Sequence, residues 1–424
     1  MMVPMMCADL SPRDSFVKRL HETRDSTVDI LMKLLAVPSE NPPGDTRRIA
    51  REIETMLSQV DGIETALVSA IPQIENVLAV VGNSATGRCL VLNGHIDTFE
   101  IGDEQQWSKN PLGEQAGCRI YGRGAADMKG GLAAQIFAAQ RLAEVKQLWR
   151  GKLVLVLAGD EETGGANGTR YVLEQQPIAN GDAMLCADAG SPHVLRFGEK
   201  GCLWITINAS GKASHGAHVH LGVSAVDRLL HALAALNGIK NIEVLRDATI
   251  EASIDAAAPY SEEISGAGET ETLRRITVNI GRITGGSVSN IVADSAQASV
   301  DIRLPLGVEL AAAKRELSRL IGTLPGISYA IDIEAEPNAT QPDHEIVKRM
   351  ALVGEEVLGR KVVATMRVGA SDSPHFRARG IPSVVCGLTP FNMGAPDEYV
   401  LTDELRALGE IYALAAFDYL SAVD

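Results

Sequence analysis

Apolar residues in the first half of the chain follow two different spacings. Intervals of three and four, which predict helices, occur in residues 11–35, 47–60 and 130–145. Short apolar runs, which predict strands, cover residues 75–81, 88–93, 151–158 and 183–187. The run at 151–158 is apolar almost throughout, as expected of a strand covered on both faces. Alternating helices and buried strands predict an α/β sheet, here with mixed strand directions, flanked by helices.

The spacing changes between residues 199 and 336. Strands with alternating polar and apolar residues are predicted at 202–209, 275–281, 296–304 and 328–335, and helices at 224–236 and 309–320. After residue 337 the pattern of the first part of the chain returns, with helices predicted at 344–358 and 402–422 and a buried, apolar strand at 381–387. We therefore predict an α/β domain formed by residues 1–198 and 337–424, interrupted by an inserted α+β domain at 199–336.

Composition and charge exclude several functions. The chain has 39 Lys and Arg against 54 Asp and Glu, a formal charge of −15, which argues against binding to nucleic acid or to an anionic membrane. Six cysteines without CxxC spacing predict reduced, mostly buried thiols. The N-terminus lacks the pattern of a signal peptide, and no apolar run is long enough to span a bilayer. We expect a cytoplasmic protein.

The predicted strand at 88–93 leads into Gly94-His95-Ile96-Asp97-Thr98. Ligands of open α/β sheets bind at the carboxyl ends of strands. In extended geometry His95 and Asp97 point the same way, and a metal-bound imidazole usually donates its other N–H to a carboxylate. His95 then ligates a metal and Asp97 orients it. The alternative is a loop histidine beside a surface aspartate.

Further carboxylates follow other predicted strands and precede a helix. In YGRGAADMKGG (121–131), which has no phosphate-loop spacing, Asp127 is presented at a helix start, where it could also be a simple cap. The strand at 151–158 is followed directly by Gly-Asp-Glu161-Glu162-Thr-Gly-Gly. Adjacent carboxylates repel one another, so a cation could balance them and leave one as general base; the alternative is a solvated turn. With Asp188 after the strand at 183–187, these residues form a nitrogen and oxygen set suited to zinc, manganese or cobalt.

GHIDT, YGRGAADMKGG, AGDEETGG and the Asp188 loop, in this order, resemble the M20 metallopeptidase family over nearly the whole chain. Its members include acetylornithine deacetylase, succinyl-diaminopimelate desuccinylase, aminoacylase and carboxypeptidase G. The resemblance implies that residues 1–198 and 337–424 form a metal-binding catalytic domain and residues 199–336 a lid or dimerisation domain.

The resemblance also implies roles for individual residues. His95, Asp127 and Asp188 would ligate one metal ion, and Asp127 would bridge to a second ion held by Glu162. Glu161 would be the general base that deprotonates the metal-activated water, and Asp97 would orient His95.

In the inserted domain, His215 of Gly211-Lys-Ala-Ser-His215-Gly-Ala matches a histidine that reaches the partner subunit's active site in relatives and stabilises the oxyanion. A loop histidine beside His218 and His220 is the alternative. Three further positions resemble contacts to the substrate's anionic group: Asn290, Arg303 and Gly369. For Arg303 a structural ion pair on a strand is an equal alternative. The implied assembly is a homodimer or a higher homo-oligomer.

The leading hypothesis is a metal-dependent hydrolase of a C–N bond in a small carboxylate-bearing substrate, an N-acyl amino acid or a short peptide-like molecule. A non-catalytic binding protein on the same fold is an alternative from a different class. The retained Glu161 argues against it, since a binding protein has no need of a poised base.

One position departs from the family. Relatives commonly carry His-x-Pro-Asp-Glu-Tyr, whose histidine completes the second metal site, whereas this chain has Gly394-Ala-Pro-Asp-Glu-Tyr. The second site then lacks a ligand unless His375, otherwise a residue that contacts substrate or solvent, replaces it. We predict one tightly held ion or a labile centre rather than two ions. The departure also supports a further alternative, an aminohydrolase similar to 5-nitroanthranilate aminohydrolase, which replaces an activated aromatic amine with hydroxyl.

Overall fold

The computed structural model describes residues 11–82 and 86–422. The chain divides into two compact units. The first unit comprises Met1–Phe197, Thr340–Ala364 and Ser371–Asp424, and the second comprises Gly198–Ala339 and Thr365–Ala370. Strands β8 (Val194–Glu199) and β14 (Val363–Arg367) each run from one unit into the other. Within the described ranges, no helix is both long and apolar enough to cross a membrane.

In the described part of the chain, nine strands form the larger sheet, in the order β1-β2-β6-β3-β7-β15-β8-β13 with β14 paired to β8. Its remaining strands are β1 (Ile63–Ile71), β2 (Ile74–Val81), β3 (Cys89–His95), β6 (Lys152–Ala158), β7 (Ala183–Cys186), β13 (Asn338–Ala339) and β15 (Ser383–Val385). β3 pairs in parallel with β6 and β7, whereas β2 pairs antiparallel with β1 and β6. The predicted mixed sheet is confirmed. Every side chain of β6 after Lys152 is buried, as its apolar sequence predicts.

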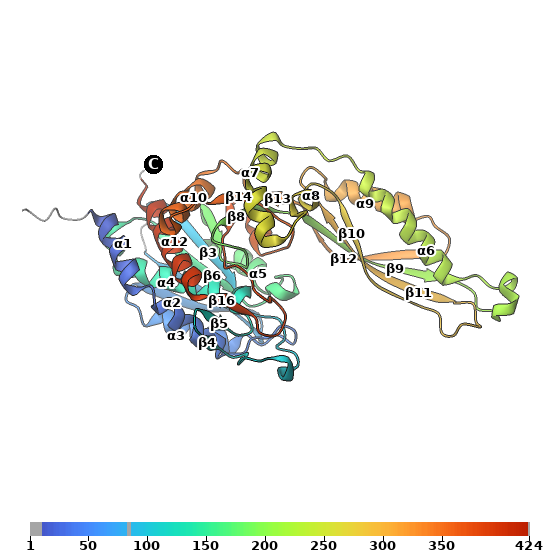
Figure 1. Cartoon of the computed structure of the whole chain (residues 1–424), viewed down its shortest axis with the longest axis horizontal. Coiled ribbons are helices and arrows are strands. Elements are labelled where there is room, and N and C mark those ends of the chain that lie inside the picture. Colours follow the sequence, from blue (N-terminus) through green and yellow to red (C-terminus); the bar gives the residue numbers. More distant parts are fainter. Residues whose placement is uncertain (1–10, 83–85, 423–424) are drawn as a thin grey trace, which may run out of the picture. The chain divides into compact units, whose positions relative to one another are not determined.

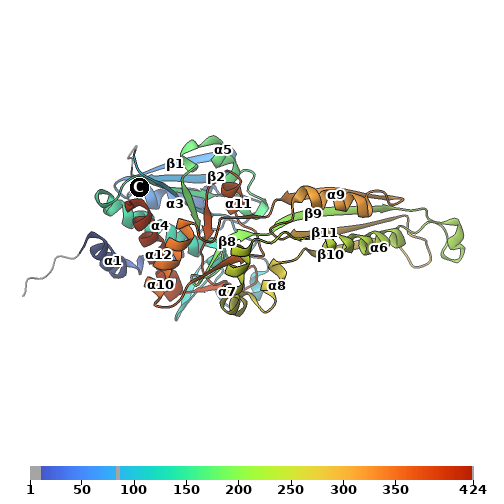
Figure 2. The same ribbon diagram turned by 90° about the horizontal axis from the view of Figure 1, so that it is seen from above.

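Helices cover both faces of this sheet (Figures 1 and 2). One layer contains α1 (Pro12–Thr23), α2 (Ser26–Leu35), α3 (Arg47–Ser58), α4 (Gly130–Glu144), α10 (Glu345–Leu358) and α12 (Thr402–Ser421), and the other contains α5 (Thr169–Gln175) and α11 (Ser373–Arg377). α4 begins against the loop that follows β7. A β-carbon at Gly131 would lie 2.0 Å from the carbonyl oxygen of Ala187, so glycine permits this close approach.

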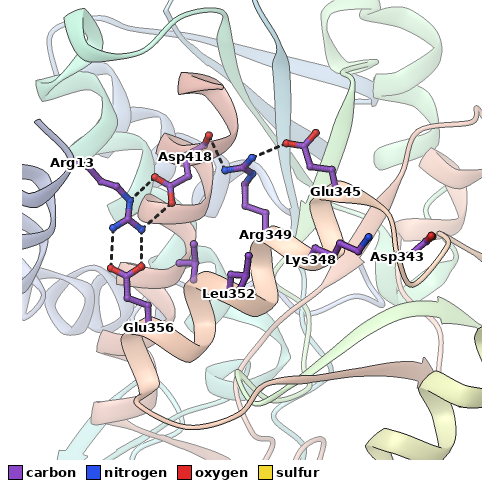
Figure 3. A pocket seen from close by; sticks show the side chains of 9 residues that line it. Arg13, Asp343, Glu345, Lys348, Arg349, Leu352, Glu356 and Asp418 are labelled. Carbon is purple, nitrogen blue, oxygen red and sulfur yellow. Dashed lines mark hydrogen bonds and ion pairs between the residues drawn. The ribbon is translucent and has the colours of Figure 1, made fainter. Parts of the chain in front are cut away.

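Ion pairs join α1, α10 and α12 around a charged surface pocket (Figure 3). The Arg13 guanidinium lies 2.7 Å from the Glu356 carboxylate and 2.8 Å from that of Asp418. Arg349 is paired in the same way with Glu345, at 2.7 Å. Since these arginines are already paired with carboxylates of the same pocket, we interpret it as a helix-joining network rather than a ligand site.

A small sheet joins two segments that are far apart in sequence. It consists of β4 (Glu114–Ala116), β5 (Arg119–Tyr121) and β16 (Tyr399–Leu401) in the order β16-β5-β4. The antiparallel register pairs Tyr399 with Tyr121. This pairing brings the segment around residue 398 beside the loop that carries Asp127.

The second unit contains an antiparallel sheet in the order β10-β11-β9-β12. Its elements are β9 (Gly201–Ser210), β10 (Thr277–Gly285), β11 (Ser295–Leu304), β12 (Ile327–Ala335), α6 (Ala225–Leu236), α7 (Ala248–Ser265), α8 (Glu269–Leu273) and α9 (Leu310–Ile321). α6 and α9 lie side by side over the sheet (Figures 1 and 2). The inward residues of β9 and β11 alternate with exposed ones and share a core with both helices.

Several elements differ from those expected. The helix predicted at 11–35 is two helices, separated at residues 24 and 25. β1 was not predicted, because as a half-exposed edge strand it has no buried run. α7 was missed as well, since only a few of its residues face the core. Residues 365–370 group with the second unit, whereas the predicted boundaries leave them in the first.

Candidate metal centre

The predicted site residues of the first unit come from neighbouring strand ends. His95, the last residue of β3, lies opposite Ala158, the last residue of β6. Glu161 and Glu162 follow β6, and Asp188 follows β7 by two residues. Since β3, β6 and β7 are parallel neighbours, their carboxyl ends meet at one edge of the sheet. Side chains that are distant in sequence therefore converge there.

His95, Asp127 and Asp188 form one group of potential ligands, with one ligand atom of each within 4.8 Å of the others. Asp127 lies in the turn Ala125–Lys129 that leads into α4. Its Oδ1 is 3.0 Å from Nε2 of His95. His95 and Asp188 are almost completely buried. The structure thus brings together the three residues expected to hold one metal ion.

A second group consists of His95, Glu161 and Glu162, again within 4.8 Å of one another. Oε1 of Glu162 is buried and has no hydrogen-bond partner among the described residues. A buried carboxylate oxygen without a partner is costly, and a cation would satisfy it. Since this group does not include Asp127, the bridging of Asp127 to an ion held by Glu162 stays a prediction.

Burial and mutual repulsion disfavour charge on the carboxylates of the centre. Burial raises the pKa of Glu162 to about 8, and His95 only partly opposes this effect. Burial likewise raises the pKa of Glu161 well above its ordinary value, and neighbouring carboxylates add to the rise. For His95, burial is the largest effect and lowers the pKa, but the contacts with Asp127 and Asp97 and the charge of Glu161 together outweigh it, so the pKa is raised. A divalent cation would stabilise the ionised carboxylates.

The donor set fits a transition metal. One imidazole nitrogen and several carboxylate oxygens are typical ligands of zinc, manganese or cobalt. Oε1 of Glu162, which has no hydrogen-bond partner among the described residues, is a further oxygen that could ligate the ion. The residues present therefore match the ion that the sequence leads us to expect.

Asp97 contacts His95 in a different way from the one expected. Nδ1 of His95 is 2.9 Å from the main-chain oxygen of Asp97 but 3.6 Å from its carboxylate. Because β3 ends at His95, the two-residue period of a strand does not continue to Asp97. Its buried carboxylate instead accepts hydrogen bonds from the main-chain N–H groups of Glu161 and Glu162, at 3.3 and 3.1 Å, and from Asn41, at 2.9 Å. Asp97 thus holds the backbone of the acidic pair.

Two buried residues near the centre were not expected from the sequence. Asn41 supports Asp97, as described above. Asp372 accepts a hydrogen bond from Oγ1 of Thr169 at 2.6 Å, burial raises its pKa to about 6, and its charge contributes to the raised pKa of Glu161. In the sequence Asp372 ends Gly369-Ala-Ser-Asp372, a loop that the resemblance places near the substrate's carboxylate, but no role was predicted for its side chain.

His375 and Gly394 bear on the second metal site. Nε2 of His375, on α11, lies 3.8 Å from Oδ1 of Asp372, and His375 belongs to neither ligand group found among the described residues. Gly394 has a φ of 74°, and a β-carbon there would lie 3.7 Å from the ring of Phe99. The structure therefore does not place His375 among the ligand groups, and its roles as replacement ligand or substrate contact stay predictions.

The remaining predicted residues lie in the second unit. His215 and Asn290 are in adjacent loops, where the N–H of Gly216 donates to the carbonyl of Asn290 at 2.7 Å. Arg303 lies on β11 and is paired with Asp301 at 2.8 Å. This contact matches the alternative expected for Arg303, a structural ion pair on a strand. Gly369 follows β14. The substrate-contact and oxyanion roles of these residues stay predictions.

Residues 91–418 match the sequence pattern of peptidase family M20/M25/M40. The chain belongs to this family. It is accordingly a hydrolase acting on C–N bonds, and the M20 family depends on metal ions. The chain is 29% identical over 412 residues to the succinyl-diaminopimelate desuccinylase of Parvibaculum lavamentivorans, covering 93% of this chain and 95% of that protein. It is 30% identical over 358 residues to the desuccinylase of Methylocella silvestris, covering 81% and 84%.

Solved structures of other proteins share the fold. A metallo-carboxypeptidase of the M20 family from Sulfolobus solfataricus superposes with a TM-score of 0.79 at 20% identity, covering 93% of this chain and 99% of that one. Human carnosine dipeptidase 1 gives 0.77 at 16% identity, covering 97% and 99%. A dinuclear metal-binding M20 peptidase from Bacillus subtilis gives 0.65 at 15% identity, covering 97% and 100%. At these identities the likeness supports the fold.

The metal-free protein should lose stability as the pH rises from 4.5 to about 8, the ordinary and folded-state pKa values of Glu162. The folded state holds a proton on Glu162 that the unfolded state releases at lower pH, so the free energy of unfolding falls with pH across this window. Urea unfolding of the chelator-treated protein, followed by circular dichroism at several pH values, measures this slope.

Glu162→Gln should reduce the slope, because it removes the titrating group. Glu174→Gln, an exposed position on α5, is the matched control and should leave the slope unchanged. Equal slopes for the unsubstituted protein and Glu162→Gln would show that Glu162 does not titrate in this range.

Proposed function

We propose that this M20 hydrolase cleaves the amide bond of a small carboxylate-bearing substrate, either an N-acyl amino acid or a short peptide-like molecule, with Glu161 as the general base. The observation that carries the proposal is the position of half-buried Glu161 within the ligand group of His95 and Glu162. The similarity to desuccinylases over most of both chains also supports an amide substrate.

An ion held by His95, Asp127 and Asp188 would lower the pKa of water and polarise the scissile carbonyl. Glu161 would take a proton from the attacking water and later give it to the leaving nitrogen, so that the oxygen ends on the acyl carbon as the C–N bond breaks. A general base works best when its pKa lies near the working pH. Burial raises the pKa of Glu161, and a bound cation would act in the opposite direction. The hydrogen bond from the Glu161 N–H to Asp97 holds the base in place.

Replacing the base should strongly reduce turnover without loss of the bound metal. Glu161→Gln keeps the shape of the side chain but cannot accept the proton, so kcat should fall by about 10²–10⁴-fold. KM and metal content should stay close to those of the unsubstituted protein. The assay is a substrate screen over acyl amino acids, dipeptides, carbamoyl compounds and amino-aromatic acids, with metal content measured in parallel.

Glu174→Gln is the matched control for this substitution and should retain full activity. If Glu161→Gln turns over substrate at the unsubstituted rate, Glu161 is not the base. If the unsubstituted protein binds metal but hydrolyses none of these compounds, an amide substrate of this class is ruled out.

Gly394 favours a second candidate function. Without a side-chain ligand at this position, a second ion would depend on the carboxylates of Glu162 and Asp127, so the centre should hold a single ion tightly. A single ion can still activate water for attack on an aromatic carbon that bears an amine, with ammonia leaving and a hydroxyl taking its place. Release of ammonia from an amino-aromatic acid, in place of a carboxylic acid and an amine from an acyl amino acid, distinguishes this aminohydrolase from an amidase.

After extensive dialysis the protein should retain one equivalent of metal per chain. Gly394→His should raise this to two, because it adds the imidazole that relatives carry; histidine tolerates a positive φ better than most residues. Metal analysis by mass spectrometry gives the stoichiometry, and His375→Ala serves as the comparison. Two equivalents in the unsubstituted protein, with one lost in His375→Ala, would contradict the single-ion centre and assign the second site to His375.

We further propose that the second unit mediates formation of a homodimer. β10 stands at an edge of its sheet, and its apolar residues Ile280 and Ile283 are 39% and 51% exposed. Leu230 of α6 is exposed as well, at 53%. An apolar, exposed edge strand is a ready template for pairing with another chain, and a second copy supplies an identical strand.

Ile283→Lys should shift the protein from dimer to monomer, because it places a charge in the proposed interface. Ile71→Lys is the matched control, since Ile71 is 42% exposed on β1, an edge strand of the larger sheet. Sedimentation velocity at assay concentration measures the assembly. A fully active monomer of the unsubstituted protein would contradict both the dimer and the predicted contribution of His215 to a partner's site.

A further inference from the structure

Glu398 lies directly before β16 and beside the loop that carries Asp127. The antiparallel pairing of Tyr399 with Tyr121 fixes this position. The N–H of Gly122 donates to the main-chain oxygen of Glu398 at 2.9 Å, so the contact between the two segments continues past the end of the small sheet.

The carboxylate of Glu398 is directed entirely at this loop. Its Oε1 accepts hydrogen bonds from the main-chain N–H groups of Ala126, at 2.9 Å, and of Asp127 itself, at 3.3 Å. Its Oε2 accepts a hydrogen bond from Nη1 of Arg123 at 2.6 Å. The residue is 0% exposed. One buried carboxylate thus binds three donors within five consecutive residues, and the last donor belongs to a member of the ligand group.

Arg123 extends this contact to neighbouring segments. Its guanidinium is 4% exposed, donates through Nε to the carbonyl of Glu100 at 2.9 Å and through Nη2 to the carbonyl of Gly394 at 3.2 Å, and stacks over Trp107. The ion pair with Glu398 therefore ties the Asp127 loop to the segment that contains Gly394. This segment contributes no side-chain ligand at residue 394, yet it contacts the centre through Glu398.

We propose that Glu398 is a positioning residue for the metal centre, which sets the direction of the Asp127 carboxylate by holding the main chain at residues 126 and 127. The inference rests on the proposed function, because it requires Asp127 to ligate the ion. Groups that orient ligands typically contribute about 10–100-fold to metal affinity. A contact that served folding alone would have no reason to affect the binding of metal by folded protein.

The test is the metal affinity of Glu398→Gln. The amide cannot accept hydrogen bonds on both sides of the side chain, so one of the two contacts, to Arg123 or to the N–H groups, is lost. The dissociation constant for Mn²⁺, measured by competition with a chelating dye, should rise at least about tenfold. Activity should return when Mn²⁺ is added in excess, with an unchanged KM. Hydrogen exchange at residues 125–128 should accelerate.

A buried arginine without its partner can prevent folding, so the double variant Arg123→Gln and Glu398→Gln is measured as well. It leaves no unpaired charge but still lacks the carboxylate, and it should show the same weakened affinity. Glu404→Gln is the matched control. Glu404 of α12 is half-buried and accepts hydrogen bonds from the N–H and Oγ1 of Thr389, at 3.1 and 3.0 Å. These contacts do not involve the Asp127 loop, so the replacement should leave the dissociation constant unchanged.

The outcomes separate this proposal from the one it rests on. If Glu398→Gln or the double variant folds and binds Mn²⁺ as tightly as the unsubstituted protein, Glu398 does not position the centre, whatever the reaction. An equal loss of affinity in Glu404→Gln would also overturn the proposal, because the effect would then be general. If the unsubstituted protein binds no metal, or if Asp127→Asn leaves the affinity for Mn²⁺ unchanged, the proposed function is contradicted, and the role of Glu398 falls with it.

Discussion

Crowded negative charge at the ends of β3, β6 and β7 is the constraint on which the rest of the centre depends. Asp127, Glu161, Glu162 and Asp188 converge on one histidine, and burial raises the pKa of both glutamates. Bringing such groups out of water costs several kcal/mol each unless an opposite charge compensates. A divalent cation, on which the M20 family depends, would supply that charge.

Residues around the centre bind the main chain of the loops that carry the candidate ligands. Asp97 accepts hydrogen bonds from the N–H groups of Glu161 and Glu162, and Glu398 does the same for Asp127. Two loops of the centre are thus each fixed by a buried carboxylate from a distant part of the chain. Loops are the most mobile parts of a fold. A centre built on loops therefore needs such contacts to keep its ligands in fixed positions.

The segment around Gly394 is held by contacts that do not involve the side chain at that position. The segment around residue 394 still pairs β16 with β5 and still binds Arg123 through a main-chain oxygen. Neither contact requires a particular side chain at residue 394. The scaffold at this segment therefore does not depend on the side chain at residue 394.

The sequence by itself determined the family, the mixed sheet flanked by helices, and the convergence of His95, Asp127 and Asp188. Four ordered motifs indicated the family and, through the resemblance, the grouping of these three residues. The sheet could be predicted because buried strands have a local signature, continuous apolar residues. Elements without that signature were missed: β1 is a half-exposed edge strand, and α7 faces the core with few residues.

Only the tertiary structure decided the contacts between segments that are distant in sequence. Asn41 reaches Asp97 across 56 residues, and Glu398 reaches Asp127 across 271. The pairing of Arg303 with Asp301 depends on a choice of side-chain conformation within one strand. Such contacts follow from packing and from the satisfaction of buried polar groups, which depend on the whole fold and leave no periodic pattern along the chain.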